Sequence, residues 1–207
     1  MSFLNSVVAP ALFPSILWRT TERSVHITFD DGPHPAATQT VLKILHARGI
    51  RASFFLVGRN VQQYPEISRE ILLAGHSIGN HTQTHQVMFL KSAEVQRREI
   101  QAANEVIGEF LNSKPRFFRP PYGYFDLRTL NIAETEGQRV VMWDVDSRDF
   151  STSLPQSIVR SVTKSVTPGS IVLFHDNAST AGSIGAYLEL VLDQLLQRGF
   201  QFSVLPL

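Results

Sequence analysis

The feature that most constrains the fold of this chain is a regular alternation of short β-rich runs with helical stretches. The runs have the length and composition of strands, and the segments between them repeat apolar residues at helical spacing. The predicted strands cover residues 25–29, 51–56, 76–79, 116–118, 139–142, 170–174 and 201–204. This alternation predicts parallel strands joined by right-handed crossovers.

The helical stretches have recognisable ends. Gly49, Gly75 and Gly199 each follow a helical pattern, where glycine closes a helix in the left-handed conformation. Ser92 stands before a helix predicted to begin at Ala93, and its hydroxyl can cap the first turn. A chain of 207 residues is about the size of one domain. No glycine-rich phosphate loop opens a helical stretch, so a closed or nearly closed α/β barrel is favoured over an open nucleotide-binding sheet.

Composition excludes several function classes. Lys and Arg number 19 and Asp and Glu number 18, so the chain has no basic excess for a nucleic-acid backbone and no nucleic-acid partner is expected. Cysteine is absent, which removes disulfides, thiolate nucleophiles and cysteine-held metals. Any metal must therefore be held by carboxylates and by some of the seven histidines.

The most apolar stretch covers residues 7–18 and is interrupted by Pro10 and Pro14. It is shorter than the roughly 20 apolar residues of a spanning helix, so no transmembrane segment is predicted. It has no preceding Lys or Arg and no following small-residue cleavage site, so no classical secretory signal is predicted and the cellular location stays open. We expect residues 1–24 to pack on the bottom of the domain, with contact to a membrane surface as the alternative.

Polar residues follow the predicted strands in a consistent way. Just after a strand-like run come Asp30 and Asp31, His81, Arg119, residues 146–149, and His175. In a parallel α/β barrel the carboxyl ends of the strands share one rim. Residues distant in the sequence are therefore predicted to converge on one site.

The first motif reads Thr-Phe-Asp-Asp-Gly-Pro from Thr28. Adjacent side chains of a strand point to opposite faces, so Asp30 and Asp31 can serve one site only if the strand has ended. Gly32 and Pro33 supply that ending. The alternative is an ordinary acidic turn in which an aspartate caps the next helix.

The second motif pairs His81 with His85. Imidazoles four residues apart fall on one face of a helical turn and can chelate one cation, although a chance surface pair is the alternative. A carboxylate on the same rim would complete a site of two histidines and one aspartate. Three protein ligands leave positions open for water, which is typical of catalytic metal sites.

The third motif is Arg-Pro-Pro-Tyr-Gly from Arg119. The two prolines have no N–H, so the N–H groups of Tyr122 and Gly123 are the free donors of a rigid loop. Such a loop suits an oxyanion hole. A structural proline turn with a salt-bridged arginine is the alternative.

The fourth and fifth motifs add aromatic and acid–base groups. Between Trp143 and Phe150, acidic residues flanked by aromatic rings suit a sugar site, with a core position for Trp143 as the alternative. Asp144 is interpreted as a solvated loop residue. An apolar run then ends in His175, which is predicted to act as a general acid on the rim. Asp176 is expected only to cap the following turn.

The remaining histidines have structural interpretations. His26 and His46 are interpreted as exposed strand and helix positions, and His76 as the first residue of a strand. His34 has no predicted role.

In this order the motifs TFDDGP, HTxxH, RPPYG, DSxDF and LFHD resemble the polysaccharide deacetylases of carbohydrate esterase family 4, the NodB homology domain. The resemblance runs over residues 25–207 and leaves residues 1–24 as an N-terminal segment. It implies a single-domain α/β fold, a distorted TIM-like barrel of seven or eight β/α units. It also implies a divalent metal, commonly Zn²⁺, and hydrolysis of N-acetyl groups on GlcNAc-type units of a polysaccharide.

The resemblance also implies roles for single residues. It implies metal ligands at Asp31, His81 and His85. It implies acid–base and transition-state roles for five residues: Asp30 as base, Arg119 as its charge partner, Tyr122 as oxyanion donor, Asp149 as the carboxylate that tunes the catalytic histidine, and His175 as acid.

Substrate contacts follow from the same resemblance. They are expected at Tyr122, Trp143, Phe150 and Leu173, of which Leu173 corresponds to a wall of the acetyl pocket. One position departs from the family, because Phe150 stands where tryptophan is usual, which changes a wall of the groove.

The expected partner is an acetylated amino-sugar polymer or oligomer. Chitin oligomers, peptidoglycan and exopolysaccharide all stay open as substrates, and so does the oligomeric state. Two other functions are alternatives: a metal-dependent deformylase or small-molecule amidase, and a carbohydrate-binding pseudoenzyme.

Overall fold

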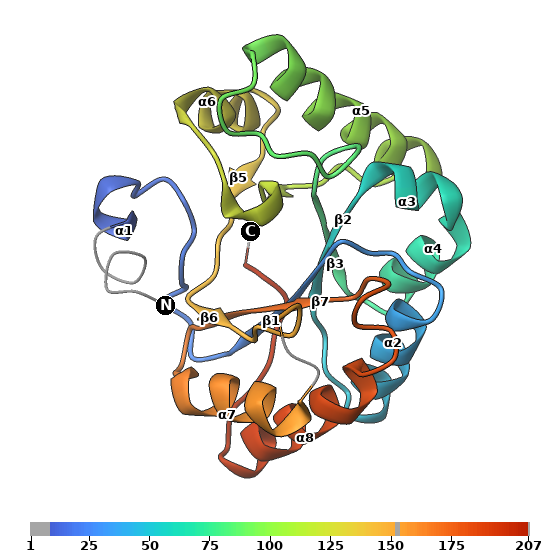
Figure 1. Ribbon diagram of the computed structural model, residues 1–207, viewed down its shortest axis with the longest axis vertical. Coiled ribbons are helices and arrows are strands. Elements are labelled where there is room, and N and C mark those ends of the chain that lie inside the picture. Colours follow the sequence, from blue (N-terminus) through green and yellow to red (C-terminus); the bar gives the residue numbers. More distant parts are fainter. Residues whose placement is uncertain (1–8, 152–153, 207) are drawn as a thin grey trace.

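The computed structural model describes residues 9–151 and 154–206, in which the strands form one parallel sheet in the order β5-β4-β3-β2-β1-β7-β6. The sheet is curled, and most of the helices lie around its outside (Figure 1). The strands are β1 (His26–Asp30), β2 (Ser53–Leu56), β3 (Ser77–Asn80), β4 (Phe117–Phe118), β5 (Arg139–Val140), β6 (Val145–Asp146) and β7 (Ile171–His175).

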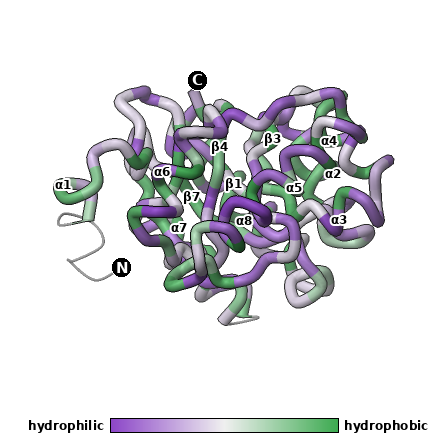
Figure 2. Tube along the Cα trace, turned by 90° about the horizontal axis from the view of Figure 1, so that it is seen from above, coloured by the Kyte–Doolittle hydropathy of each residue, from purple (hydrophilic) through white to green (hydrophobic). Residues whose placement is uncertain are grey.

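The helices are α1 (Ala9–Leu12), α2 (Ala37–Ala47), α3 (Gly58–Gln63), α4 (Pro65–Leu73), α5 (Ala93–Leu111), α6 (Leu127–Thr135), α7 (Pro155–Ser165) and α8 (Ile184–Gln197), with a 3₁₀ turn η2 (Pro121–Gly123). Six of the helices, α2 to α7, lie between successive strands, whereas α1 precedes β1 and α8 follows β7. Seen from above, the traces of the outer helices alternate hydrophobic and hydrophilic stretches (Figure 2). This alternation is what helices packed on one face require.

The predicted helix ends are confirmed. The Ser92 side chain accepts a hydrogen bond from the N–H of Val95 at the start of α5. Gly49, Gly75 and Gly199 have φ angles of 63°, 79° and 81°, the left-handed conformation that glycine adopts without strain.

The edges of the sheet approach each other because the chain passes directly from one edge strand to the other. β5 ends at Val140 and β6 begins at Val145, although these strands stand at opposite ends of the strand order. A connection of five residue steps reaches at most about 18 Å. The sheet must therefore curl, and the predicted distorted α/β barrel is confirmed as a seven-stranded half-barrel in one domain.

Strands β1 and β7 are neighbours in the sheet and pair over all five of their residues. All residues of β1 are buried, and Asp30 at its end lies opposite His175 at the end of β7. Behind them Phe29 stacks on Phe54 and on Phe174, with ring centroids 5.0 and 5.9 Å apart. Dense apolar packing of this kind fixes the direction in which residues at the strand ends project.

The described part of the N-terminal segment contacts the sheet. Leu17 forms a parallel bridge with Val141, and Ile16 and Leu17 are buried. Residues 1–8 lie outside the described residues, so the division into a segment 1–24 and a domain 25–207 stays a prediction. None of the helices in the described ranges is long and apolar enough for a membrane span.

One predicted strand is absent from the structure, and one strand was not predicted. Residues 201–204 form no strand, and their sheet contact is a single bridge between Val25 and Phe202. The short strand β6 was not predicted, because Val145 and Asp146 lie between the polar residues Asp144 and Ser147 and lack an apolar run. Parallel pairing of Val145 with Val172 of β7 makes this pair a strand, which is a tertiary effect.

Two structural interpretations of polar residues are also wrong. His26 is fully buried rather than exposed, because its ring bonds to the Thr20 hydroxyl and to main-chain carbonyls near the C-terminus. Asp144 is no solvated loop residue. It accepts the N–H of Ile171 at 2.7 Å and pairs with Arg19 at 2.9 Å, which ties the β5–β6 connection to β7. His46 is exposed as predicted.

Candidate active site

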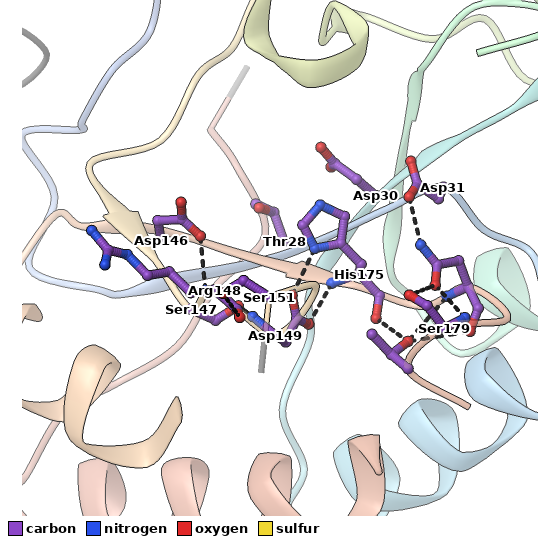
Figure 3. A network of polar contacts seen from close by, with 12 residues as sticks. Thr28, Asp30, Asp31, Asp146, Ser147, Arg148, Asp149, Ser151, His175 and Ser179 are labelled. Carbon is purple, nitrogen blue, oxygen red and sulfur yellow. Dashed lines mark hydrogen bonds and ion pairs between the residues drawn. The ribbon is translucent and has the colours of Figure 1, made fainter. Parts of the chain in front are cut away.

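The polar residues predicted to share the rim do lie together in the structure. Asp30 and His175 end the paired strands β1 and β7, and His81 directly follows β3. Figure 3 shows His175 between Asp149 on one side and the pair Asp30 and Asp31 on the other.

Asp31, His81 and His85 offer ligand atoms that all lie within 4.8 Å of one another. Nε2 of His85 is 2.9 Å from Oδ1 of Asp31, and Nε2 of His81 is 3.4 Å from the same oxygen. Two imidazoles and a carboxylate converging in this way are a donor set suited to a divalent transition metal. The residues present therefore fit the metal that the sequence resemblance implies.

The hydrogen bonds around the triad orient its ligand atoms. Nδ1 of His81 lies 2.7 Å from the carbonyl oxygen of Arg119, which favours the tautomer with its proton on Nδ1 and leaves Nε2 as the ligand. Nδ2 of Asn177 donates to Oδ2 of Asp31 at 2.7 Å. Burial raises the pKa of Asp31, but hydrogen bonds and charges of the two histidines outweigh it and hold that pKa far below its usual range.

The predicted helical setting of the histidine pair is wrong, because residues 81–85 form a loop. Thr82 and His85 have φ angles of 69° and 61°, and the chain bends between the two imidazoles. This bend, rather than helical spacing, brings both rings to Asp31, with ring centroids 4.9 Å apart.

Two residues hold this loop, and one of them, Glu99, was missed by the sequence analysis. The buried Glu99 of α5 accepts the N–H of Thr84 at 2.8 Å and also its hydroxyl. Asn80 accepts the N–H of Thr82 at 2.7 Å. A glutamate on the apolar face of a predicted helix was the available signal, since a buried acid needs a partner.

Arg119 is fully buried. Its guanidinium lies between the Asp30 carboxylate and the β5–β6 connection, where the two edges of the half-barrel face each other. Its Nη1 donates to Oδ1 of Asp30 at 2.7 Å. Its other nitrogens donate to the carbonyls of Val141 and Met142 in the β5–β6 connection, and its guanidinium lies 4.0 Å from the ring centroid of Phe55. The arginine thus presents a fixed positive charge to Asp30.

The loop that follows Arg119 was predicted to have two free N–H donors, and the structure leaves only one of them without a main-chain acceptor. The N–H of Gly123 bonds to the carbonyl of Pro120, so it is not free. The N–H of Tyr122 has no main-chain acceptor among the described residues, and Tyr122 itself has a φ of 60°. Its ring packs on His85 at 4.7 Å between centroids, so this loop lies directly beside the triad.

On the opposite side of the triad, His175 bonds to Asp149, with its Nδ1 at 2.7 Å from Oδ1. The other carboxylate oxygen accepts the main-chain N–H of His175 and the hydroxyl of Tyr187, a partner that the sequence analysis missed. Burial alone lowers the pKa of His175. The hydrogen bond and charge of Asp149, with smaller effects of Asp30 and Asp31, outweigh burial and raise it to about 9.

A cavity of about 540 Å³ joins these groups. Its floor holds the triad, Asp30 and His175, and its walls are formed by Tyr122, Tyr124, Trp143, Phe150 and Leu173. Phe150 is exposed and its ring stands edge-on to His175 at 5.5 Å. A second, polar cavity of about 380 Å³ continues from Asp31 and His85 toward Arg59 and Tyr64.

Asp176 was expected only to cap a turn, but it is fully buried. Its carboxyl group accepts the hydroxyl of Thr38 and packs beside Gly32. Burial, with the nearby charges of Asp31 and Asp30, raises its pKa well above the usual range despite the hydrogen bond from Thr38.

His34 also has a structural role that was not predicted. Its Nδ1 accepts the main-chain N–H groups of Ala36 and Ala37, at 3.3 and 3.2 Å, and so caps the start of α2. The predicted alternative, an aspartate cap on this helix, is wrong.

The half-barrel, with a histidine–aspartate triad in a cavity on the strand-end rim, defines a class of parallel α/β enzymes with their chemistry at that rim. The family model for polysaccharide deacetylases matches residues 18–141. The chain belongs to the polysaccharide deacetylase family, the class of enzyme that the five sequence motifs predict.

Curated relatives align with this chain over most of their length. The chain is 35% identical over 198 residues to a chitooligosaccharide deacetylase of Azorhizobium caulinodans, covering 89% of this chain and 94% of the relative. It is 34% identical to a peptidoglycan-N-acetylglucosamine deacetylase of Bacillus cereus, covering 87% and 85% of the two chains.

Solved structures share the fold. A peptidoglycan N-acetylglucosamine deacetylase matches with a TM-score of 0.88 and 29% identity, covering 93% of this chain and 91% of that one. A carbohydrate esterase family 4 pseudoenzyme from Bacillus anthracis matches with a TM-score of 0.84 and 28% identity, covering 93% and 68%.

Proposed function

We propose that this protein is a metal-dependent hydrolase that removes N-acetyl groups from GlcNAc-type units of a polysaccharide and releases acetate. One observation carries the proposal. The convergent ligands Asp31, His81 and His85 share a cavity with a paired carboxylate, Asp30, and with a histidine of raised pKa, His175. Groups for metal binding, proton removal and proton donation thus face one space.

The three ligands of the triad would hold the metal, and we propose Zn²⁺ because imidazole and carboxylate are ligands that zinc prefers in catalytic sites. When bound there, the ion supplies Lewis acidity and a water of lowered pKa. Asn177 and the carbonyl of Arg119 orient Asp31 and His81 for this role.

Asp30 is the proposed general base. Its carboxylate is paired with the buried Arg119 and lies 3.8 Å from Nε2 of His81, so it stays close to the triad without belonging to it. The buried guanidinium of Arg119 donates to its Oδ1 at 2.7 Å and holds the carboxylate in place. Asp30 accepts a proton as the oxygen of water attacks the acetyl carbon.

His175 is the proposed general acid. Asp149 keeps its ring protonated and oriented. As the bond between the acetyl carbon and the sugar nitrogen breaks, His175 gives a proton to that nitrogen. Water is thereby consumed, and acetate and a free amine leave.

The aromatic wall of the cavity is proposed to hold the sugar. The N–H of Tyr122 would donate to the oxygen that gains negative charge in the transition state. Trp143, Phe150 and Leu173 line the same cavity, and Leu173 is proposed as a wall for the acetyl methyl group.

The names of the relatives support acetylated amino-sugar substrates, either chitooligosaccharide or peptidoglycan. The deformylase or small-molecule amidase stays the alternative, as does a carbohydrate-binding pseudoenzyme. Against the pseudoenzyme stands the presence of every proposed ligand, base and acid in this chain.

An acetate-release assay tests the proposal. The purified protein is incubated with chitooligosaccharides, peptidoglycan, an acetylated exopolysaccharide and formylated small amides, with Zn²⁺ or with a chelator. We expect acetate from at least one acetylated glycan, and loss of that signal with the chelator. Release of formate alone would support the amidase, and no release from any substrate with zinc present would support the pseudoenzyme.

A further inference from the structure

Gly32 and Asp176 each directly follow a residue of the candidate site. Gly32 directly follows the triad residue Asp31 after β1, and Asp176 directly follows His175 after β7. Because β1 and β7 are neighbours in the sheet, these two residues meet behind the cavity. The proposed mechanism uses neither of them.

The contact between them leaves no room for a side chain on Gly32. A Cβ at this position would lie 2.8 Å from the carboxyl carbon of Asp176 and closer still to both carboxyl oxygens. Real Cβ contacts are not that short, so the carboxyl group fills the space where a side chain of residue 32 would stand.

The Asp176 side chain cannot easily swing away. It is fully buried, and one of its oxygens accepts the hydroxyl of Thr38, which itself accepts the main-chain N–H of His34 at 2.8 Å. Its other oxygen has no hydrogen-bond partner among the described residues. The carboxyl therefore acts through its volume and through Thr38, which ties it to the turn that follows Gly32.

Two further contacts join the same strand ends. The N–H of Asp176 donates to the carbonyl of Asp30 at 3.1 Å, and Asn177 donates to the carboxylate of Asp31. Figure 3 shows the hydrogen bond that reaches Asp31 from this segment. The spacing between a metal ligand and the general acid therefore depends on the segment 175–177.

We propose that Asp176 is a positioning residue whose buried carboxyl packs against Gly32 and sets the place of Asp31 in the metal-binding triad relative to His175. This inference rests on the proposed function, since it assigns Asp31 to a metal. Asp176 touches neither the substrate nor the reacting atoms. It acts through Gly32 and Thr38.

A double-mutant cycle tests the pair directly. We expect G32A to weaken Zn²⁺ binding by about tenfold or more, because its methyl group pushes Asp31 away from Asp176. We expect D176A to weaken it as well, because Gly32 and Thr38 lose their support. In G32A/D176A the new methyl occupies part of the space that the carboxyl leaves, so zinc affinity should exceed that of G32A.

The conservative variant D176N separates position from charge. Its amide keeps the volume of the carboxyl and one oxygen for Thr38, so zinc affinity should stay within about threefold of the parent protein. A loss in D176N as large as that in D176A would overturn the proposal, because the charge rather than the packing would then matter. Additive losses of zinc affinity in the cycle would overturn it as well.

The readouts separate this role from mere stability. Zinc affinity is measured by competition with a chromophoric chelator, and folding by thermal unfolding of each metal-free variant. The control is L192A in α8, a buried core position outside the described cavity, which should lower the unfolding temperature while leaving zinc affinity unchanged. If D176A and L192A both lost stability and neither lost zinc affinity, Asp176 would be structural only.

The same experiment distinguishes this inference from the proposed function. If the parent protein bound no zinc, the proposed function would fail before the cycle could be read. If the parent protein bound zinc and released acetate while Gly32 and Asp176 showed no coupling, the inference alone would fail.

Discussion

Nη1 of Arg119 lies 2.7 Å from Oδ1 of Asp30, and this ion pair is buried at the point where the barrel is open. The arginine also donates to the carbonyls of Val141 and Met142, which belong to the connection between the edge strands. One side chain thus completes the barrel wall and supports the proposed catalytic base. The chemistry and the closure of the fold are joined in this residue.

Asp30→Asn is expected to keep the metal and lose turnover. The amide cannot accept a proton, and general base catalysis contributes about 10²–10⁴-fold, so kcat should fall by about that factor. Zinc content and acetate release are measured on the same sample. A variant with more than about a tenth of the parent kcat would contradict the role of Asp30 as base.

The activity should fall as the pH rises through about 9, the raised pKa of His175. Below that pH the imidazole is protonated and can act as an acid, and above it the proton is lost. Asp149→Asn removes the charge that raises this pKa and leaves one acceptor oxygen in place of two, so the alkaline limb should move to lower pH. The measurement is kcat/KM against pH for both proteins, and an unchanged limb in the variant would argue against the assignment.

Glu99→Ala should weaken zinc binding without touching a ligand. The substitution removes the acceptor of the Thr84 N–H and hydroxyl, so the loop that carries His81 and His85 is no longer held. Loss of such a supporting partner typically costs about 10–100-fold in metal affinity. Glu99→Gln keeps one acceptor oxygen and should lose less. Equal zinc affinity in the parent protein and the alanine variant would refute this support.

The stability of the fold should fall in mild acid through His76. Burial, with the charge of Arg51, lowers its pKa from 6.5 to about 4, and its Nδ1 accepts the N–H of Ala52. A histidine whose folded pKa is lowered stabilises the fold above its unfolded pKa, and this contribution is lost as the pH falls from 6.5 toward 4.

The expected loss is about 2 kcal/mol in the free energy of unfolding between about pH 7 and pH 5. His76→Asn keeps an acceptor near Ala52 and does not titrate, so its loss over the same range should be smaller. Denaturant unfolding of both metal-free proteins measures the difference. Parallel pH profiles for the two proteins would show that His76 does not contribute.

Much of the fold could be predicted because it depends on local patterns. Gly49, Gly75 and Ser92 mark helix ends by their own conformational preferences, so the alternation of helices and strands could be inferred. The strand β6 could not, because Val145 and Asp146 become a strand only by pairing with β7. The burial of His26 could not be predicted for the same reason, because its hydrogen-bond partners lie far along the chain.

In the candidate site, too, some features could be predicted from local patterns and others depend on tertiary contacts. The carboxyl ends of parallel strands share a rim, which places Asp30 and His175 together without knowledge of any contact. The loop shape at His85 and the groups that Glu99 and Tyr187 contact could not be inferred, because they depend on how α5 and α8 pack on the sheet. Spacing suggested a helix for the histidine pair, whereas the chain bends there in a loop with two left-handed residues.

Metal content tests the central claim, that Asp31, His81 and His85 bind a single divalent ion. The parent protein, His81→Ala and His175→Ala are loaded with Zn²⁺, desalted and analysed for zinc per chain. The parent protein and His175→Ala should each hold one ion, whereas His81→Ala should hold almost none, and both variants should lose acetate release. Equal zinc loss in the two variants, or full zinc content in His81→Ala, would contradict the account.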